Sequence, residues 1–152
     1  MLKGLDPILN ADVLYALRAM GHGDMLILAD TNFPSDAIAQ ETVHGEVLRI
    51  DRPMAEVARA VLSVMPLDTF VEDFAGRMEV VDDAATVPPV QAEVQAEIAA
   101  TGETRDMVGI ERFAFYDLAR DAYAVIQTGE RRFYGCIMLR KGVIGPEDRS
   151  YD

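Results

Sequence analysis

The sequence predicts a single-domain α/β fold in which a mixed, mostly parallel sheet is flanked by helices. Its 152 residues suffice for one domain with a substantial core, and half of them are apolar. Short apolar runs alternate with stretches of helical periodicity, which is typical of strands connected by helices. The run Met25–Ala29 is apolar throughout, as expected for a strand that is buried on both faces.

The first half of the chain is expected to form two helices and two strands. Asn10 can cap a helix that ends before Gly21, and Pro53 favours the start of a later helix. Phe33 follows the first strand and could either pack in the core or cover a ligand. The expected elements are a helix over 11–20, strands over 25–29 and 46–50, and a helix over 51–65.

The second half is expected to add four strands and two helices. In a helix opened by Pro88–Pro89, the apolar residues form a narrow stripe, which places this helix on the outside. A turn at 128–130 predicts a hairpin that forms an antiparallel edge of the sheet. The expected elements are strands over 69–74, 77–81, 123–127 and 133–139, and helices over 89–100 and 110–121. We expect residues 1–152 to be one domain with a polar, partly mobile tail after about residue 143.

The composition argues against several classes of partner. Twenty-six acidic residues against 14 basic ones give a formal net charge of −12, which is opposite to the basic surface that nucleic acids and anionic membranes require. No apolar run reaches the roughly 18 residues of a membrane span. A single cysteine, Cys136, rules out an internal disulfide and suits a reducing compartment. With no signal peptide at the start of the sequence, we expect a cytoplasmic protein.

A histidine between two glycines, Gly21-His22-Gly23, leads into the first strand, and Asp30 ends that strand. Histidine titrates near neutral pH and can move protons. Ligands of open α/β sheets bind beyond the carboxyl ends of strands, where Asp30 would lie. The same residues also fit a helix-capping glycine, a surface histidine and a strand-terminal aspartate. The motif alone leaves both interpretations open.

The sequence shows no other motif for catalysis or for binding phosphate or metal, and its remaining histidine and its cysteine have structural interpretations. The sequence contains no phosphate-binding glycine loop, no Gly-x-Ser-x-Gly nucleophile motif and no metal-ligand spacing, so we expect neither a metal nor a cofactor. His44 is interpreted as a surface or strand-edge residue, and Cys136 within a strand as a small buried thiol. The polar groups that remain as candidates for proton transfer and hydroxyl binding are His22, Asp30, Arg112 and Tyr134.

Five segments, taken in order, resemble the L-fucose mutarotase and D-ribose pyranase family. These segments are Met1–Pro7, Ala19–Asp24, Ala29–Asp30 with Asn32–Pro34, Arg112–Tyr116, and Thr128–Glu130 leading to Tyr134–Gly135. Members of that family interconvert the cyclic forms of free monosaccharides. The resemblance extends to about residue 143 and is weakest between 52 and 107. The Arg112–Tyr116 segment is similar to the fucose branch, because the ribose branch tends to have histidine at the position of Arg112.

The resemblance implies a role for each matching residue. His22 would be the acid and base, Asp30 and Arg112 would hold sugar hydroxyls, and Tyr134 with Gly135 would contact the sugar. Cys136 stands where the family usually has asparagine, and a thiol cannot replace an amide's paired donors and acceptor. The contact at Cys136, and with it the choice of sugar, is therefore an open question. Family members form large rings, commonly decamers, with the site near a subunit contact.

The expected function is that of an isomerase. A mutarotase would interconvert the α and β anomers of a free sugar, L-fucose in the fucose branch, by opening and closing the ring through general acid and base catalysis. One alternative is a sugar-binding accessory of a transport system without catalysis. Another is a mutarotase or pyranase for a different sugar, such as ribose or rhamnose.

Overall fold

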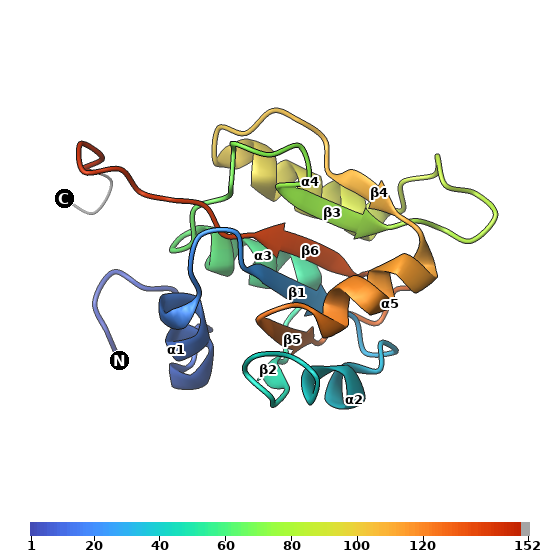
Figure 1. Ribbon diagram of the computed structural model, residues 1–152, viewed down its shortest axis with the longest axis horizontal. Coiled ribbons are helices and arrows are strands. Elements are labelled where there is room, and N and C mark those ends of the chain that lie inside the picture. Colours follow the sequence, from blue (N-terminus) through green and yellow to red (C-terminus); the bar gives the residue numbers. More distant parts are fainter. Residues whose placement is uncertain (150–152) are drawn as a thin grey trace.

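A computed structural model describes residues 1–149 of the chain; residues 150–152, the end of the expected tail, lie outside the described part. Within it, a six-stranded sheet carries helices on both faces (Figure 1). The elements in chain order are α1 (Ala11–Ala19), β1 (Met25–Ala29), α2 (Ser35–Ala39), β2 (Leu48–Ile50), α3 (Met54–Leu62), β3 (Ala75–Met78), α4 (Pro89–Ala100), β4 (Val108–Ile110), α5 (Arg112–Arg120), β5 (Ala124–Thr128) and β6 (Ile137–Arg140).

The strand order is β2-β5-β1-β6-β3-β4. Neighbours pair in parallel in β2–β5, β5–β1 and β3–β4, whereas β6 is antiparallel to both β1 and β3. Figure 1 shows the arrow of β6 running against those of β1 and β3 on either side of it. The predicted α/β class and the mixed, mostly parallel sheet are confirmed.

The predicted hairpin at an antiparallel edge is wrong. Strands β5 and β6 do not pair, because β1 lies between them, and β6 is an interior strand. Residues 129–136 separate the two strands, which is longer than the two to five residues of a tight hairpin loop. This length lets the chain cross one strand and insert β6 into the gap between β1 and β3.

Alternate residues of β1 supply the two halves of the core. Leu26 and Leu28 are fully buried against residues of α1, α3 and α4, whereas Ile27 and Ala29 are fully buried against residues of α2 and α5. In Figure 1, α3 and α4 lie behind the sheet and α5 lies in front of it. The prediction of a strand buried on both faces is therefore confirmed, and its bounds match those of β1.

The ends of α1 are held by side chains. The Asn10 side chain accepts a hydrogen bond from the Val13 N–H at 3.0 Å, which is the predicted N-cap. At the other end, the Lys141 ammonium donates to the carbonyls of Leu17 and Met20, which replaces the expected role of a capping glycine. In the turn that follows, Gly23 rather than Gly21 has a positive φ, of 87°.

The predicted strand over 69–74 does not form. The Asp68 side chain accepts a hydrogen bond from the Phe70 N–H at 3.2 Å, which turns the chain, and β3 begins only at Ala75. After β3 the chain turns again at Asp82, whose φ is 61°. Two short elements, α2 and β4, were not predicted; only their end residues, Ser35 and Ile110, fall in the predicted loop and at the start of the predicted helix.

Candidate functional site

A cavity of about 250 Å³ opens at the carboxyl ends of β1 and β3. This is the edge at which open α/β sheets bind ligands. Its volume lies just below the roughly 300–1,000 Å³ of pockets for drug-sized molecules, so it suits a smaller ligand. The lining residues combine charged, phenolic and apolar groups: Asp30, Asn32, Phe33, Met78, Arg112, Tyr116, Phe133, Tyr134 and Cys136.

Asp30 is the buried acidic group of this cavity and is 4% exposed. Its Oδ1 accepts hydrogen bonds from the N–H groups of Asn32 at 2.9 Å and Phe33 at 3.0 Å. Its Oδ2 accepts from the Gly135 N–H at 3.1 Å and from the Cys136 thiol at 3.6 Å. A carboxylate has about four acceptor positions, so protein donors already occupy all of them. The thiol is the longest and weakest of the four donors.

Cys136 is buried, as the sequence predicted, but it lies directly before β6 and not within a strand. Burial raises the pKa of the Cys136 thiol well above its usual value, and the nearby negative charge of Asp30 adds to that effect. The group therefore stays a protonated thiol at neutral pH, which can donate a hydrogen bond to Asp30 and has little nucleophilic character.

Gly135 occupies a position where a side chain does not fit. A Cβ placed on this residue would lie 2.9 Å from Cγ of Glu130 and 3.3 Å from Cβ of Asp30. The absence of a Cβ lets the backbone N–H reach the Asp30 carboxylate. Gly135 therefore joins the turn before β6 to the end of β1.

Tyr134 has a left-handed backbone with a φ of 60°. Such a conformation costs a non-glycine residue of order 1 kcal/mol and persists when its surroundings hold it. The Tyr134 carbonyl accepts a hydrogen bond from Nε2 of the buried Gln91 at 2.9 Å. Its hydroxyl accepts another from the Val81 N–H at 3.2 Å. Both ends of Tyr134 are thus fixed, and its side chain lines the cavity.

Arg112 is the first residue of α5 and brings a positive charge to the cavity. Its Nε donates to the Tyr116 hydroxyl at 3.3 Å, and this hydrogen bond raises the pKa of the Arg112 guanidinium. The Tyr116 ring in turn stacks on Phe33, with ring centroids 5.4 Å apart. Phe33 is buried, which confirms the first of its two predicted alternatives, and it also lines the cavity.

His22 lies at the opposite end of β1. Its Nε2 is 3.1 Å from Oδ2 of Asp68, and its side chain is 48% exposed, whereas that of Asp68 is 4% exposed. Because a carboxylate can only accept, Nε2 carries the proton of this hydrogen bond and Nδ1 is the other ring nitrogen. The exposed Phe70 meets the His22 ring edge-on, with centroids 6.0 Å apart. A buried carboxylate thus orients an accessible imidazole, as in catalytic histidine sites.

The structure brings five of the six predicted site residues together and leaves the sixth apart. Asp30, Gly135 and Cys136 are in direct contact, and Arg112 and Tyr134 line the same cavity. The five residues of β1, at about 3.3 Å each, place roughly 16 Å between its two ends, and His22 precedes the first of them.

Sequence reasoning missed Asp68 and several cavity-lining residues. Asp68 is 46 residues from His22 in the chain, and no local spacing signals this contact. Tyr116 had a detectable signal, because it lies four residues after Arg112, on the same face of one helix.

The described part of the chain contains no group of three or more His, Cys, Asp or Glu side chains that could hold a metal ion. Among the described helices, none is both long and apolar enough to cross a bilayer.

The family model described as the RbsD / FucU transport protein family matches residues 3–144. The chain belongs to this family. Among RbsD / FucU relatives, the fucose mutarotase of Homo sapiens is 41% identical over 146 residues, which are 94% of either chain. The crystal structure of the protein Atu2016 has a TM-score of 0.93 at 59% identity and covers 95% of this chain and 97% of that one. The fucose mutarotase of Streptococcus pneumoniae, solved in complex with L-fucose, has a TM-score of 0.85 at 32% identity and covers 95% and 100%.

Proposed function

We propose that this protein is a mutarotase that interconverts the anomers of L-fucose, and hence an isomerase acting on a carbohydrate. One observation carries the proposal: in a chain related to fucose mutarotases, Asp30, Arg112 and Tyr134 converge on a cavity that suits one sugar ring. The complex of the Streptococcus pneumoniae relative with L-fucose supports this sugar over ribose or rhamnose.

The chemistry requires only proton transfer. The ring oxygen gains a proton while the anomeric hydroxyl loses one, and the hemiacetal opens to an aldehyde that can close on either face. A positioned histidine can perform both transfers near neutral pH and contributes roughly 10²–10⁴-fold to the rate. We assign this role to His22.

The cavity residues would hold the sugar for that step. Arg112 and Asp30 can bind hydroxyls through charge-assisted hydrogen bonds, which fix the anomeric centre. To accept a hydroxyl at Oδ2, Asp30 would release its weakest donor, the Cys136 thiol. The apolar C–H face of the ring would pack against Phe33 and the exposed Phe133.

We further propose that the working form is a homo-oligomer in which His22 of a second copy completes the cavity. About 16 Å of strand separates His22 from Asp30 within one chain, which is too far for both to reach one sugar. Exposed aromatic side chains support such a contact, because Phe70 beside His22 is 74% exposed and Phe133 beside the cavity is 75% exposed. A decameric ring is the assembly that the family resemblance implies.

The test is an anomer-exchange assay by NMR over L-fucose, D-ribose and L-rhamnose. We expect exchange of L-fucose to be accelerated most. Binding of L-fucose without faster exchange would instead favour a transport accessory, and faster exchange of ribose or rhamnose alone would change the substrate. Size measurement in solution tests the oligomer.

A cytoplasmic location is also proposed, in keeping with one buried, unpaired cysteine.

A further inference from the structure

Glu130 is a buried acidic residue in the turn between β5 and β6, and it is 5% exposed. Its Oε1 accepts hydrogen bonds from the backbone N–H and Nε of Arg132 at 3.0 and 2.9 Å. Its Oε2 accepts from an Arg132 terminal nitrogen at 3.0 Å and from the Met54 N–H at 3.3 Å. Four donors of the chain itself thus use all the acceptor positions of this carboxylate.

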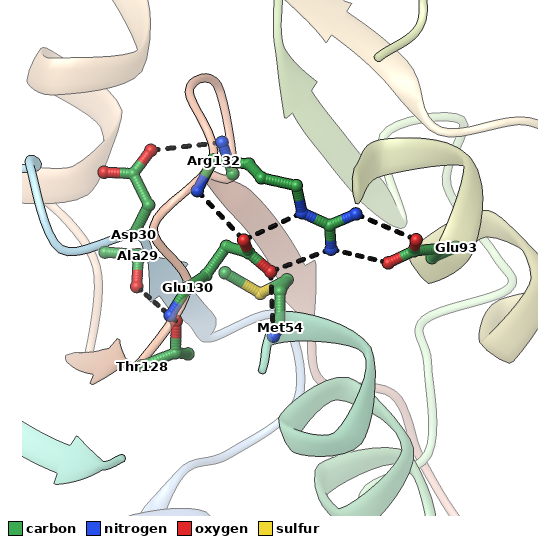
Figure 2. Close-up of polar contacts among 8 residues, drawn as sticks. Ala29, Asp30, Met54, Glu93, Thr128, Glu130 and Arg132 are labelled. Carbon is green, nitrogen blue, oxygen red and sulfur yellow. Dashed lines mark hydrogen bonds and ion pairs between the residues drawn. The ribbon is translucent and has the colours of Figure 1, made fainter. Parts of the chain in front are cut away.

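Arg132 is held from its other side by Glu93 on α4. Its two terminal nitrogens donate to the two oxygens of Glu93 at 2.9 and 2.7 Å, in a bidentate arrangement. The Arg132 guanidinium therefore donates hydrogen bonds to two carboxylates, those of Glu130 and Glu93 (Figure 2). The hydrogen bonds from Arg132 lower the pKa of Glu130 to about 2, so Glu130 is ionised at neutral pH. We call Glu130, Arg132 and Glu93 together the Glu130 clamp.

The Glu130 clamp connects the turn to α3, to α4 and to the loop after β1. Met54 is the first residue of α3, whose N-cap position has no capping side chain, and Glu130 supplies a cap from 76 residues away. Glu93 fixes the turn to α4. The Glu130 carbonyl accepts a hydrogen bond from the Thr31 N–H at 2.8 Å, which joins the turn to the residue after Asp30.

The residues held in this way come just before the ones that line the cavity. Tyr134 and Gly135 follow Arg132 within three positions, and Tyr134 has the strained backbone that needs support from its surroundings. The Glu130 clamp itself lines no part of the cavity. Its effect on a bound sugar must therefore pass through the turn.

We propose that the Glu130 clamp is a positioning device that holds Tyr134 and the Gly135 N–H against Asp30 in the geometry that binds the sugar. The inference rests on the proposed function, since it concerns the same cavity. It assigns Glu130, Arg132 and Glu93 to sugar affinity and leaves proton transfer to His22. Loss of the clamp should therefore weaken binding more than turnover of the bound sugar.

The test compares Glu130→Gln with the wild-type protein, using L-fucose as the ligand. The dissociation constant should rise by about tenfold or more, because Tyr134 and the Gly135 N–H are then no longer held in the binding geometry before the sugar arrives. The exchange rate at saturating sugar should stay within about threefold of wild type, because proton transfer is not part of the clamp's role. An unchanged dissociation constant in a folded variant overturns the proposal, as does a loss confined to the saturated rate.

Two further variants keep the test informative where Glu130→Gln fails to fold. Arg132→Lys keeps the charge and loses the planar fork. Glu93→Gln removes only the outer, half-exposed carboxylate, and its dissociation constant should rise about threefold, in line with an exposed ion pair. The matched control is Glu97→Gln on the same helix, where Glu97 pairs with Arg59 at 3.6 Å; it should leave L-fucose binding unchanged. Equal effects of Glu93→Gln and Glu97→Gln would overturn the proposal.

Amide hydrogen exchange without sugar separates this inference from the proposed function. The Gly135 amide, which donates to Asp30, should exchange faster in Glu130→Gln and Arg132→Lys than in wild type. Protection equal to wild type overturns the clamp even where L-fucose exchange is catalysed. Failure of the wild-type protein to bind or convert L-fucose would refute the proposed function and leave this amide measurement to decide on the clamp.

Discussion

His22 and Asp30 stand at opposite ends of one strand, β1, each beside a different set of side chains. His22 pairs with the buried Asp68, whereas Asp30 lines the cavity at the other end of the strand. A straight strand cannot bring its two ends together. If both residues act on one sugar, the two must come from different copies of the chain.

A mixing experiment tests this arrangement. His22→Gln and Arg112→Ala should each abolish accelerated exchange of L-fucose, by up to about 10²–10⁴-fold for the histidine. Both side chains are outside the core, so both variants should fold. Co-expression of the two variants should restore part of the activity, because some cavities then combine an intact Arg112 with His22 of another copy. No recovery in a mixed oligomer would place both groups in one copy and refute the shared site.

Asp68→Asn tests the orientation of His22. The amide keeps the size of the side chain and loses the charge that holds Nε2 at 3.1 Å. We expect the saturated exchange rate to fall by at least about tenfold while the dissociation constant of L-fucose is unchanged, because in the proposed site Asp68 holds the His22 ring and acts on the sugar only through it. Asp73→Asn nearby, whose partner is Arg140, serves as the control. A change in sugar affinity would contradict this role.

The variants Cys136→Ser and Cys136→Ala test whether the donor at position 136 competes with the sugar for Oδ2 of Asp30. A serine hydroxyl is a stronger donor than a thiol and should compete with the sugar for Oδ2, which raises KM for L-fucose. Alanine leaves that acceptor position open, so KM should stay equal to wild type or fall. The measurement is KM from NMR exchange in the three proteins. A higher KM for Cys136→Ala than for Cys136→Ser would refute the competition.

The acid stability of the protein should depend on Glu130. Its pKa falls from 4.5 to about 2 on folding, chiefly through hydrogen bonds from Arg132. A lowered folded-state pKa gives stability that is fully present above pH 4.5 and is lost as the pH falls toward 2. The unfolding free energy of wild type should therefore exceed that of Glu130→Gln by up to about 3 kcal/mol near neutral pH. Urea titrations should show this difference shrinking below pH 4.5, and a difference independent of pH would contradict it.

Local patterns predicted the parts of the fold that depend on near neighbours. The apolar run Met25–Ala29 and the cap at Asn10 are both confirmed, because burial and capping act over a few residues. The predicted hairpin was wrong, because β6 pairs with β1 and β3 and not with β5. The spacing of residues along the sequence does not reveal these pairings. The strand over 69–74 failed for a local reason, the hydrogen bond from Phe70 to Asp68.

The candidate site was predicted in the same uneven way. Asp30, Arg112, Tyr134, Gly135 and Cys136 meet because strand ends and the helix α5 share one edge of the sheet. The contact between His22 and Asp68 joins residues 46 positions apart, and the contact between Glu130 and Met54 joins residues 76 apart. Such long-range pairs depend on the whole topology.

The interior position of β6 has a consequence for how the chain is made. In the sheet, β2, β5 and β1 lie on one side of β6, and β3 and β4 lie on the other. All five of these strands are synthesised before β6. Until residue 137 emerges, the edges of β1 and β3 that pair with β6 have no partner strand, and unpaired strand edges favour aggregation. Completion of the sheet therefore waits for β6, and shortening the chain before Ile137 should leave a product that does not fold.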